Sequence, residues 1–331
     1  MVKFLVVRFS SIGDIILTTP VFRHLKQKVE DSEIHFLTKS SYATLLKENP
    51  YIDQIHSFDG DIRSCIKNLR SLEIDYVIDL HRNLRSARIK RGLRRIDFPV
   101  HKLNWQKWLL VNLKLNRLPE RHMVDRNLDT INSFIEERDK GGLDYFIPLK
   151  DEVPLHTLPG VFQHGYLGLS IGAQHETKKL PVESLVRLCQ KLEYPVLVLG
   201  GPEDRNTGEI IVSSLPEKHM VNACGSYSIH QSASLVRGAR LLITHDTGLM
   251  HIAAAFHKKI ISVWGNTVPE FGMYPYRADP SSKQFEVSGL SCRPCSKIGH
   301  QKCPKGHFKC MLQQDLDGIV RSAIQLWNAS D

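Results

Sequence analysis

An apolar, β-branched run, KFLVVRF, begins at residue 3 and leads directly into a polar loop, SSIGD. The residues after this loop have apolar side chains at helical spacing, among them Ile15, Ile16, Phe22 and Leu25. A strand, a tight loop and a helix in this order form the repeating unit of a parallel sheet, because the helix returns the chain to the start of the next strand. This opening therefore favours the α/β class.

The alternation of strands and helices continues in two series. Within the first half, strand-like runs recur at residues 34–37 and 76–80, with amphipathic segments between them. The stretch at residues 147–165 is rich in Pro, Gly and His and is the expected linker. Beyond the linker, the pattern predicts strands at residues 166–172, 195–201, 239–245 and 259–265, and helices at residues 182–192, 207–214 and 312–327 and from residue 247.

Length and pattern together predict two Rossmann-like α/β domains that face each other across a cleft. The 331 residues exceed the usual single core and suit two domains of about 150 residues, which we place at residues 1–155 and 166–331. The last helix could pack back across the domain junction. Ligands of such sheets bind at the carboxyl ends of the strands, so the loops at these ends are the candidate sites.

The sequence also indicates where the protein acts. No stretch of about 18 uncharged apolar residues occurs, and Arg8 and Asp14 interrupt the apolar start in a way that signal peptides do not. We therefore expect a cytoplasmic protein. Its net charge of +9 is uneven, because residues 1–150 carry an excess of seven positive charges and the rest an excess of two. An anionic partner should therefore meet the first half.

The loop SSIGD, at the end of the first strand, is the first candidate site. It lacks the G-x-G-x-x-G spacing of a dinucleotide fingerprint, which disfavours a nicotinamide or flavin enzyme. Gly13 permits a tight turn, and Asp14 lies near a helix start, where a carboxylate is favoured electrostatically. Asp14 is either a helix cap or a catalytic base. Asparagine would serve a cap almost as well but cannot serve as a base, so this substitution separates the two roles.

The second candidate is THDTGLMH, residues 244–251, which follows one strand and opens a helix. Backbone N–H groups at a helix start, together with the Thr247 hydroxyl, would form an anion site suited to a diphosphate. Taken singly, Asp246 is typical of an N-cap and His251 of a structural histidine. Because Gly248 lets a ligand approach the backbone and His251 shares its helix face, the combination favours a binding site.

The third candidate is SIGA, residues 170–173, which leads to Lys178 and Lys179. A lysine just beyond a glycine-containing strand end can neutralise the charge that builds on a leaving phosphate. On its own, a pair of solvated lysines is the simpler interpretation.

Five segments resemble the successive signatures of the heptosyltransferases, glycosyltransferase family 9, in the same order and across nearly the whole chain. They are VVRFSSIGDIILTTPV, IDLHRNLRS, GLSIGAQHETKKLP, LVLGGPEDR and THDTGLMHIAAAFHKKIISVWGNTVPE. The resemblance implies a GT-B fold and inverting transfer of a heptose from ADP-heptose or a related nucleotide sugar. It also implies an anionic glycolipid acceptor, the inner core of lipopolysaccharide, and no required metal or other cofactor.

The resemblance assigns roles to residues of this sequence. It makes residues 1–155 the acceptor-binding domain and residues 166–331 the nucleotide-sugar-binding domain. Asp14 becomes the base that deprotonates the acceptor hydroxyl, with Ser11 and Gly13 beside the acceptor. The residues assigned to the donor are Lys178, Asp246, Thr247, Gly248, His251 and, on a less clean match, Glu203.

Three positions depart from the family pattern. Leu180 stands where relatives often have an aromatic residue, and Ala173 and Gln174 stand where hydroxyl residues can line the phosphate loop. These departures weaken the implication of heptose as the sugar more than that of sugar transfer.

A basic cluster at residues 82–95 contains no acidic residue. Arg82, Arg85 and Arg88 recur at three-residue spacing and would share one face of a helix. Arginine suits the phosphates and carboxylates of an anionic glycolipid, so we assign these three to the acceptor. A solvated basic face and a peripheral contact with the inner membrane are the alternatives, whereas nucleic acid is disfavoured because the cluster has no aromatic residues for base stacking.

Four of the seven cysteines, Cys292, Cys295, Cys303 and Cys310, lie close together in the sequence. With two nearby histidines they offer enough ligands for a structural zinc, but the second pair lacks the C-x2-C spacing. Reduced, packed thiols are the preferred interpretation, and the choice stays open.

Three hypotheses follow. The leading one is an inverting glycosyltransferase, and the main alternative is a catalytically idle module that binds a nucleotide sugar or nucleic acid. The third is a zinc-dependent interaction protein, which would contain stoichiometric metal.

Overall fold

The computed structural model describes residues 1–329, which form two compact units. The first unit comprises Met1–Leu103 and Arg121–Phe146, and the second comprises Asn104–Glu120 and the chain from Ile147 onward. The sequence pattern predicted a boundary between the units near residue 147. It did not predict that Asn104–Glu120 belongs to the second unit.

The first unit contains a five-stranded parallel sheet with the order β3-β2-β1-β4-β5. Its central strand is apolar and buried along most of its length, as expected for a strand that is covered on both faces. The strands are β1 (Val2–Val7), β2 (Ser32–Thr38), β3 (Gln54–Ser57), β4 (Tyr76–Asp79) and β5 (Ile96–Pro99). The helices are α1 (Ile12–Ile16), α2 (Thr19–Lys28), α3 (Ser40–Ala43), η1 (Thr44–Leu46), α4 (Ile62–Arg70), α5 (Leu84–Leu93), α7 (Met123–Leu128) and η3 (Asp129–Ile131).

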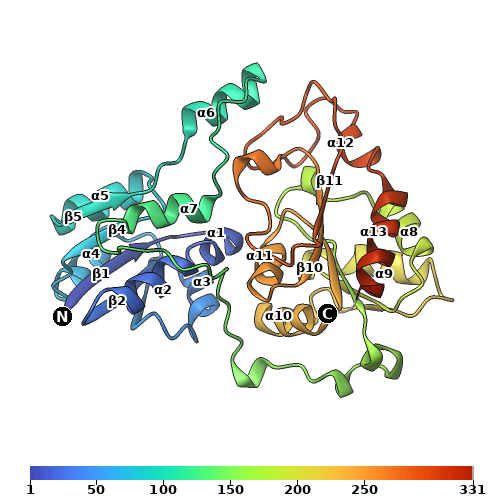
Figure 1. The fold of residues 1–331 in the computed structure, drawn as a ribbon, viewed down its shortest axis with the longest axis horizontal. Coiled ribbons are helices and arrows are strands. Elements are labelled where there is room, and N and C mark those ends of the chain that lie inside the picture. The colour runs from blue at the N-terminus through green and yellow to red at the C-terminus, as the bar shows by residue number, and fades with distance from the viewer. Residues whose placement is uncertain (330–331) are drawn as a thin grey trace. The chain divides into compact units, whose positions relative to one another are not determined.

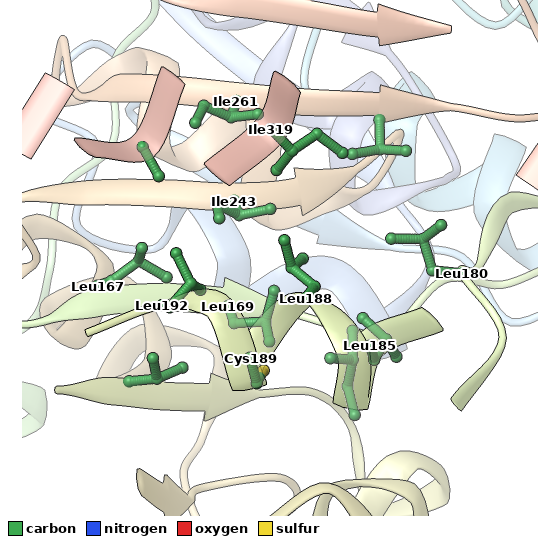
Figure 2. Close-up of a cluster of buried hydrophobic side chains, with 14 of the residues drawn as sticks. Leu167, Leu169, Leu180, Leu185, Leu188, Cys189, Leu192, Ile243, Ile261 and Ile319 are labelled. Atoms are coloured by element: carbon green, nitrogen blue, oxygen red, sulfur yellow. The ribbon is translucent and has the colours of Figure 1, made fainter. Parts of the chain in front are cut away.

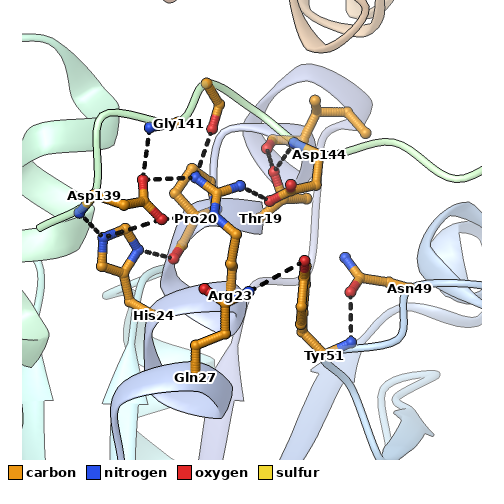
Figure 3. Close-up of polar contacts among 12 residues, drawn as sticks. Thr19, Pro20, Arg23, His24, Gln27, Asn49, Tyr51, Asp139, Gly141 and Asp144 are labelled. Atoms are coloured by element: carbon orange, nitrogen blue, oxygen red, sulfur yellow. Dashed lines mark hydrogen bonds and ion pairs between the residues drawn. The ribbon is translucent and has the colours of Figure 1, made fainter.

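Charged contacts join α2 to the segment that returns to this unit (Figure 3). Arg23 forms ion pairs with Asp139, at 2.9 Å, and with Asp144. His24 Nε2 accepts a hydrogen bond from the Asp139 backbone N–H at 3.0 Å, so its Nδ1–H donates to the Pro20 carbonyl at 2.6 Å. Because the arginine is buried and bonded on several sides, these contacts hold the segment against the helix.

The second unit contains a six-stranded parallel sheet with the order β11-β10-β9-β6-β7-β8. Strands β10 and β11 of this sheet can be found in Figure 1. Its strands are β6 (Leu167–Ser170), β7 (Val196–Leu199), β8 (Met220–Asn222), β9 (Leu241–His245), β10 (Lys259–Trp264) and β11 (Lys283–Glu286). Its longer helices are α8 (Val182–Lys191), α9 (Arg205–Ser213), α10 (Ile229–Gly238), α11 (Gly248–Ala255) and α13 (Leu316–Asn328). Its short helical segments are α6 (Asn104–Trp108), η2 (Leu109–Leu113), η4 (Leu149–Asp151), η5 (Leu155–Thr157), η6 (Gly160–His164), η7 (Glu176–Lys178), η8 (Pro202–Asp204), η9 (Pro269–Phe271) and α12 (Lys309–Leu312).

The core of the second unit lies between this sheet and two of its helices (Figure 2). Leu185 and Leu188 from α8 and Ile319 from α13 pack against Leu169 and Ile243 of the strands. The expected terminal helix is therefore present, and its main contacts are with α8, β9 and β10 of its own unit. It begins at Leu316, later than predicted, because Asp315 caps it by accepting the Gly318 N–H at 2.8 Å.

Both units confirm the predicted α/β class with parallel sheets. Across residues 1–329, no helix has the length and apolar character needed to cross a bilayer.

Candidate active site

Asp14 lies in the third position of α1, the short helix that follows β1. Ser11 is the N-cap residue, and both its backbone N–H, at 3.2 Å, and its hydroxyl, at 2.9 Å, donate to Asp14 Oδ2. Gly13 is buried inside the same helical turn. The carboxylate thus bonds to the helix start, as the capping interpretation required.

A second partner of Asp14 was not anticipated from the sequence. The Arg8 guanidinium lies 2.5 Å from Asp14 Oδ1, and it also donates to the Leu80 carbonyl at 2.5 Å and to the Ser10 carbonyl at 2.9 Å. Burial alone would raise the pKa of Asp14, but Arg8 and the bonds from Ser11 together lower this pKa to about 2. Asp14 is therefore an ionised, preoriented carboxylate with one side turned to a buried arginine.

This ion pair corrects one expectation about Asp14. Asparagine would preserve the bond to the helix start, but it would leave the Arg8 guanidinium, only 7% exposed, without its counter-charge. Removing one partner of such a pair is costly even when the helix cap survives. Asp14→Asn is therefore not a stability-neutral substitution, and it needs a control at Arg8.

His81 is a further residue of this region that sequence reasoning missed. It follows β4, the neighbour of β1, and its ring packs edge-on against Phe9 with centroids 4.9 Å apart. Burial, together with the positive charges of Arg8 and Lys102, lowers the pKa of His81 to about 4, so the ring is neutral at physiological pH. The position of His81 in the strand-end motif IDLHRNLRS could have indicated a site residue, because loops at the carboxyl ends of parallel strands hold ligands.

The arginine cluster is organised differently from the prediction. Arg82 precedes α5 and its N-cap Asn83, has a left-handed backbone (φ 44°), and donates to the Val100 carbonyl at 3.0 Å. It therefore does not share a helix face with the others, because the helix begins only at Leu84. Arg85 and Arg88 are both exposed on α5, one turn apart. These two remain available to an anionic ligand.

In the second unit, polar and charged side chains from the loops after three neighbouring strands lie close together. The carboxyl ends of β6, β9 and β10 lie side by side in the sheet. Lys178 follows β6, and its Nζ lies 2.6 Å from Oδ2 of Asp246, which follows β9. Thr267, after β10, donates its hydroxyl to the same oxygen at 3.0 Å. The predicted residues Lys178 and Asp246 thus form one cluster, and Thr267 joins it.

The start of α11 lies directly beyond Asp246. Thr247 is the N-cap residue, and its side chain makes no capping hydrogen bond; its hydroxyl lies 3.3 Å from that of Thr244. Gly248 is the first residue of the helix, and His251 is buried one turn later. Asp246 is therefore not the N-cap that its sequence context suggested. The arrangement presents helix N–H groups beside a lysine, which suits a phosphate.

The neighbouring charged residues of this unit have structural roles. Lys179 forms ion pairs with Asp204, at 3.0 Å, and with Glu176, at 2.9 Å. The Asp204 carboxylate in turn accepts the Gly201 N–H at 3.0 Å. Glu203 follows β7 and is exposed at the same edge of the sheet, so a role toward a nucleoside remains a prediction.

The four late cysteines gather around one loop of the second unit. Cys292 Sγ lies 3.6 Å from His307 Nε2, and burial together with neighbouring thiols raises the pKa of Cys295 and, to about 11, that of Cys310. All seven cysteines have free thiols. Within residues 1–329, no three His, Cys, Asp or Glu side chains are arranged to hold a metal ion.

Comparison with known proteins decides the family. The model of glycosyltransferase family 9 (heptosyltransferase) matches residues 62–308. The chain belongs to this family. It is therefore an enzyme, a glycosyltransferase, as the resemblance in the sequence predicted.

Individual relatives are similar along nearly their whole length. Lipooligosaccharide heptosyltransferase 2 of Haemophilus ducreyi is 23% identical, over 98% of this chain and 99% of the relative. A glycosyl transferase family 9 structure from Veillonella parvula has a TM-score of 0.78 at 21% identity, covering 99% of this chain and 98% of that one. E. coli heptosyltransferase WaaC with ADP-2-deoxy-2-fluoro heptose has a TM-score of 0.66 at 17% identity, covering 98% and 99%. These structures have the GT-B fold that the sequence predicted for this family 9 member.

Proposed function

We propose that this family 9 enzyme transfers a heptose from ADP-heptose to the anionic inner core of a lipopolysaccharide, with inversion of the anomeric centre. The family supports sugar transfer, and the analogue of ADP-heptose bound by the structural neighbour WaaC supports this donor. The acceptor is suggested by the name of the relative from Haemophilus ducreyi. The reaction would take place in the cytoplasm, at the inner face of the inner membrane.

The observation that carries the donor assignment is the cluster at the start of α11. The Lys178 ammonium, 2.6 Å from Asp246, lies on the strand-end loop beside the helix start at Thr247 and Gly248. A diphosphate bound there would meet both the lysine charge and the helix N–H groups. Asp246, which also accepts a hydrogen bond from the Thr267 hydroxyl, holds the lysine in place, and in the transition state the lysine would stabilise the charge on the departing ADP.

The acceptor side of the proposal rests on the first unit. Asp14 would accept the proton of the attacking hydroxyl, while Arg85 and Arg88 bind phosphate or carboxylate groups of the glycolipid. The acceptor oxygen forms a bond to the anomeric carbon as the bond from that carbon to the diphosphate oxygen breaks. A carboxylate of pKa about 2 is ionised at neutral pH but is a weak base, so proton transfer would accompany the departure of ADP and not precede it.

The direct test mixes the purified chain with ADP-heptose and a heptose-free lipopolysaccharide core. We expect ADP release only when the acceptor is present, in a 1:1 ratio to a product whose anomeric configuration, determined by NMR, is opposite to that of the donor. Binding of ADP-heptose without any ADP release would instead identify an idle nucleotide-sugar module. Release from a different nucleotide sugar in a parallel panel would contradict heptose as the transferred sugar.

A further inference from the structure

Two segments of the chain contain several Lys and Arg residues but no acidic residue. Residues 101–119 contain four Lys or Arg residues and residues 287–314 contain five, and neither segment contains Asp or Glu. These nine charges equal the whole net charge of +9. The segments are far apart in the sequence, but both belong mainly to the second unit.

The structure joins the two segments directly. Lys114 Nζ donates to the carbonyls of Cys292, at 3.3 Å, and of Pro294, at 2.7 Å. An open pocket of about 390 Å³ lies between the segments, with Val111 and Lys114 on one side and Cys292 and Lys305 on the other. Lys114 and Lys305, one from each segment, therefore lie in one region of the surface, whereas the Arg293 side chain is buried and pairs with Glu286.

The α6–η2 segment is apolar on two sides. On its inner side, Leu110 packs with Val268 and Phe271, supported by Val111 and Leu118. This packing buries the inner apolar side chains of the segment. Other large apolar side chains of residues 104–115 are exposed to solvent. These are Trp105 (65% exposed), Trp108 (47%), Leu113 (53%) and Leu115 (52%).

The two tryptophans stack with their ring centroids 5.2 Å apart and their planes nearly parallel, at 5°. Single exposed apolar residues are normal, but a contiguous aromatic and aliphatic patch marks an interaction site. The second segment carries four exposed lysines, Lys297, Lys302, Lys305 and Lys309, and Lys305 lines the same pocket as Val111 and Lys114. We call these four lysines and the four exposed apolar residues the tryptophan–lysine surface.

We propose that the tryptophan–lysine surface docks the enzyme on an anionic lipid bilayer. Tryptophan and leucine insert at the boundary of headgroups and acyl chains, and lysines attract anionic headgroups, which is the composition of interfacial membrane anchors. Nucleic acid is a poorer match, because the tryptophan faces already stack on each other and the exposed leucines offer nothing to a base. The proposal concerns attachment alone and does not depend on the identity of donor or acceptor.

The experiment measures co-sedimentation of the full chain with vesicles of phosphatidylcholine alone and with vesicles that contain phosphatidylglycerol. We expect binding to the anionic vesicles only, weakened by salt. Trp105→Ser/Trp108→Ser should lower the partition coefficient at least about tenfold. Lys297→Gln/Lys302→Gln/Lys305→Gln should lower it up to about 100-fold. A matched control, Ile210→Ser/Ile324→Ser, removes two exposed apolar side chains from α9 and α13 and should bind like the wild type.

A fluorescence measurement identifies the inserted residues. Trp264 is fully buried, and Trp327 stacks on Tyr194, so brominated lipids should quench mainly Trp105 and Trp108. Trp105→Phe/Trp108→Phe should keep vesicle binding but lose the quenching. The proposal is overturned if all variants bind alike, if binding requires the glycolipid acceptor in the vesicle, or if a single-stranded oligonucleotide competes for the surface. Unchanged melting temperatures and ADP affinity of the variants exclude a folding defect.

Discussion

The loop after β1 and the loop after β9 each hold a carboxylate against a cation, but they do so in different ways. Arg8 and Asp14 belong to one continuous strand–loop–helix segment, and the arginine is nearly buried. Lys178 and Asp246 come from loops after two neighbouring strands, β6 and β9, and are 68 positions apart in the sequence. The first pair is therefore local, whereas the second exists only when the sheet has formed.

This difference bears on the role that we propose for each ion pair. In the first loop the arginine is bonded to backbone carbonyls and fixes the carboxylate, which fits the role of base that we propose for Asp14. In the second loop the roles are reversed, because Asp246, which also accepts a hydrogen bond from the Thr267 hydroxyl, fixes the ammonium of Lys178. We therefore propose that the same kind of ion pair serves a base in one unit and a cationic phosphate ligand in the other.

The largest expected effect comes from Asp14→Asn. Loss of a general base typically costs about 10²–10⁴-fold, so we expect turnover to fall by that order while the dissociation constant for ADP-heptose stays unchanged. The variant should also lose about 1–3 kcal/mol of stability, because Arg8 loses its counter-charge. Steady-state kinetics and urea unfolding measure the two effects. Turnover near that of the wild type would return Asp14 to a purely structural role.

The next effect concerns Lys178, with its sequence neighbour as the control. Lys178→Ala should lower kcat/KM for the donor by about 10²–10³-fold, because a charge on the leaving diphosphate loses its stabilising partner. Lys179→Ala breaks the contacts to Asp204 and Glu176, so it should lower the melting temperature with a much smaller effect on kcat/KM. Kinetics of both variants with ADP-heptose compare the two roles. Equal losses of kcat/KM in the two variants would contradict a donor role for Lys178 and a purely structural role for Lys179.

The pH dependence of stability tests the first ion pair alone. The pKa of Asp14 is about 2 in the folded protein, below its ordinary value of 3.8, so ionised Asp14 stabilises the fold above pH 4. This contribution, about 2 kcal/mol, should be lost as the pH falls from about 4 to 2. Urea unfolding over this range should therefore show a steeper loss in the wild type than in Asp14→Asn. Parallel curves would mean that Arg8 does not depress the pKa of Asp14.

The smallest effect is expected on α5. Arg85→Glu/Arg88→Glu should raise the KM for the acceptor about tenfold and leave that for the donor nearly unchanged, because arginine forks bind its anionic groups. Arg63→Glu/Lys67→Glu makes the same charge change on exposed positions of α4 and should leave both constants near wild type. If both double variants raise the acceptor KM alike, the cause is the overall electrostatic field of the protein and not direct binding of the acceptor at α5.

Local patterns in the sequence were sufficient for much of this fold. The strands and helices around both candidate loops follow from apolar runs and strand-end glycines, and each predicted donor residue except Glu203 lies at or beside the start of α11. Thr267 was not predicted, because its contact with Asp246 depends on β10 lying next to β9. Arg8 was missed for another reason: it was taken as an interruption of an apolar run, although its burial requires a carboxylate partner.

The arginines at residues 82–95 show that regular spacing alone does not predict where a helix begins. Equal spacing predicted one helix face for Arg82, Arg85 and Arg88, but the Asp79 carboxylate accepts the backbone N–H groups of His81 and Arg82 and keeps this turn out of the helix. Asn83 then caps α5 by accepting the backbone N–H groups of Arg85 and Ser86, so the helix begins at Leu84. Neither did any local pattern indicate that Asn104–Glu120 would join the second unit, since that follows from packing of Leu110 against Phe271.

The role of Asp14 as the base is tested most sharply when both partners of its ion pair with Arg8 are substituted together. Arg8→Gln/Asp14→Asn removes both charges, so it should recover most of the stability that Asp14→Asn loses. If Asp14 is the base, turnover of the double variant with ADP-heptose should remain about 10²–10⁴-fold below that of the wild type, as in the single variant. If Asp14 serves only to compensate Arg8, turnover should return together with the melting temperature, and this result would exclude Asp14 as the base.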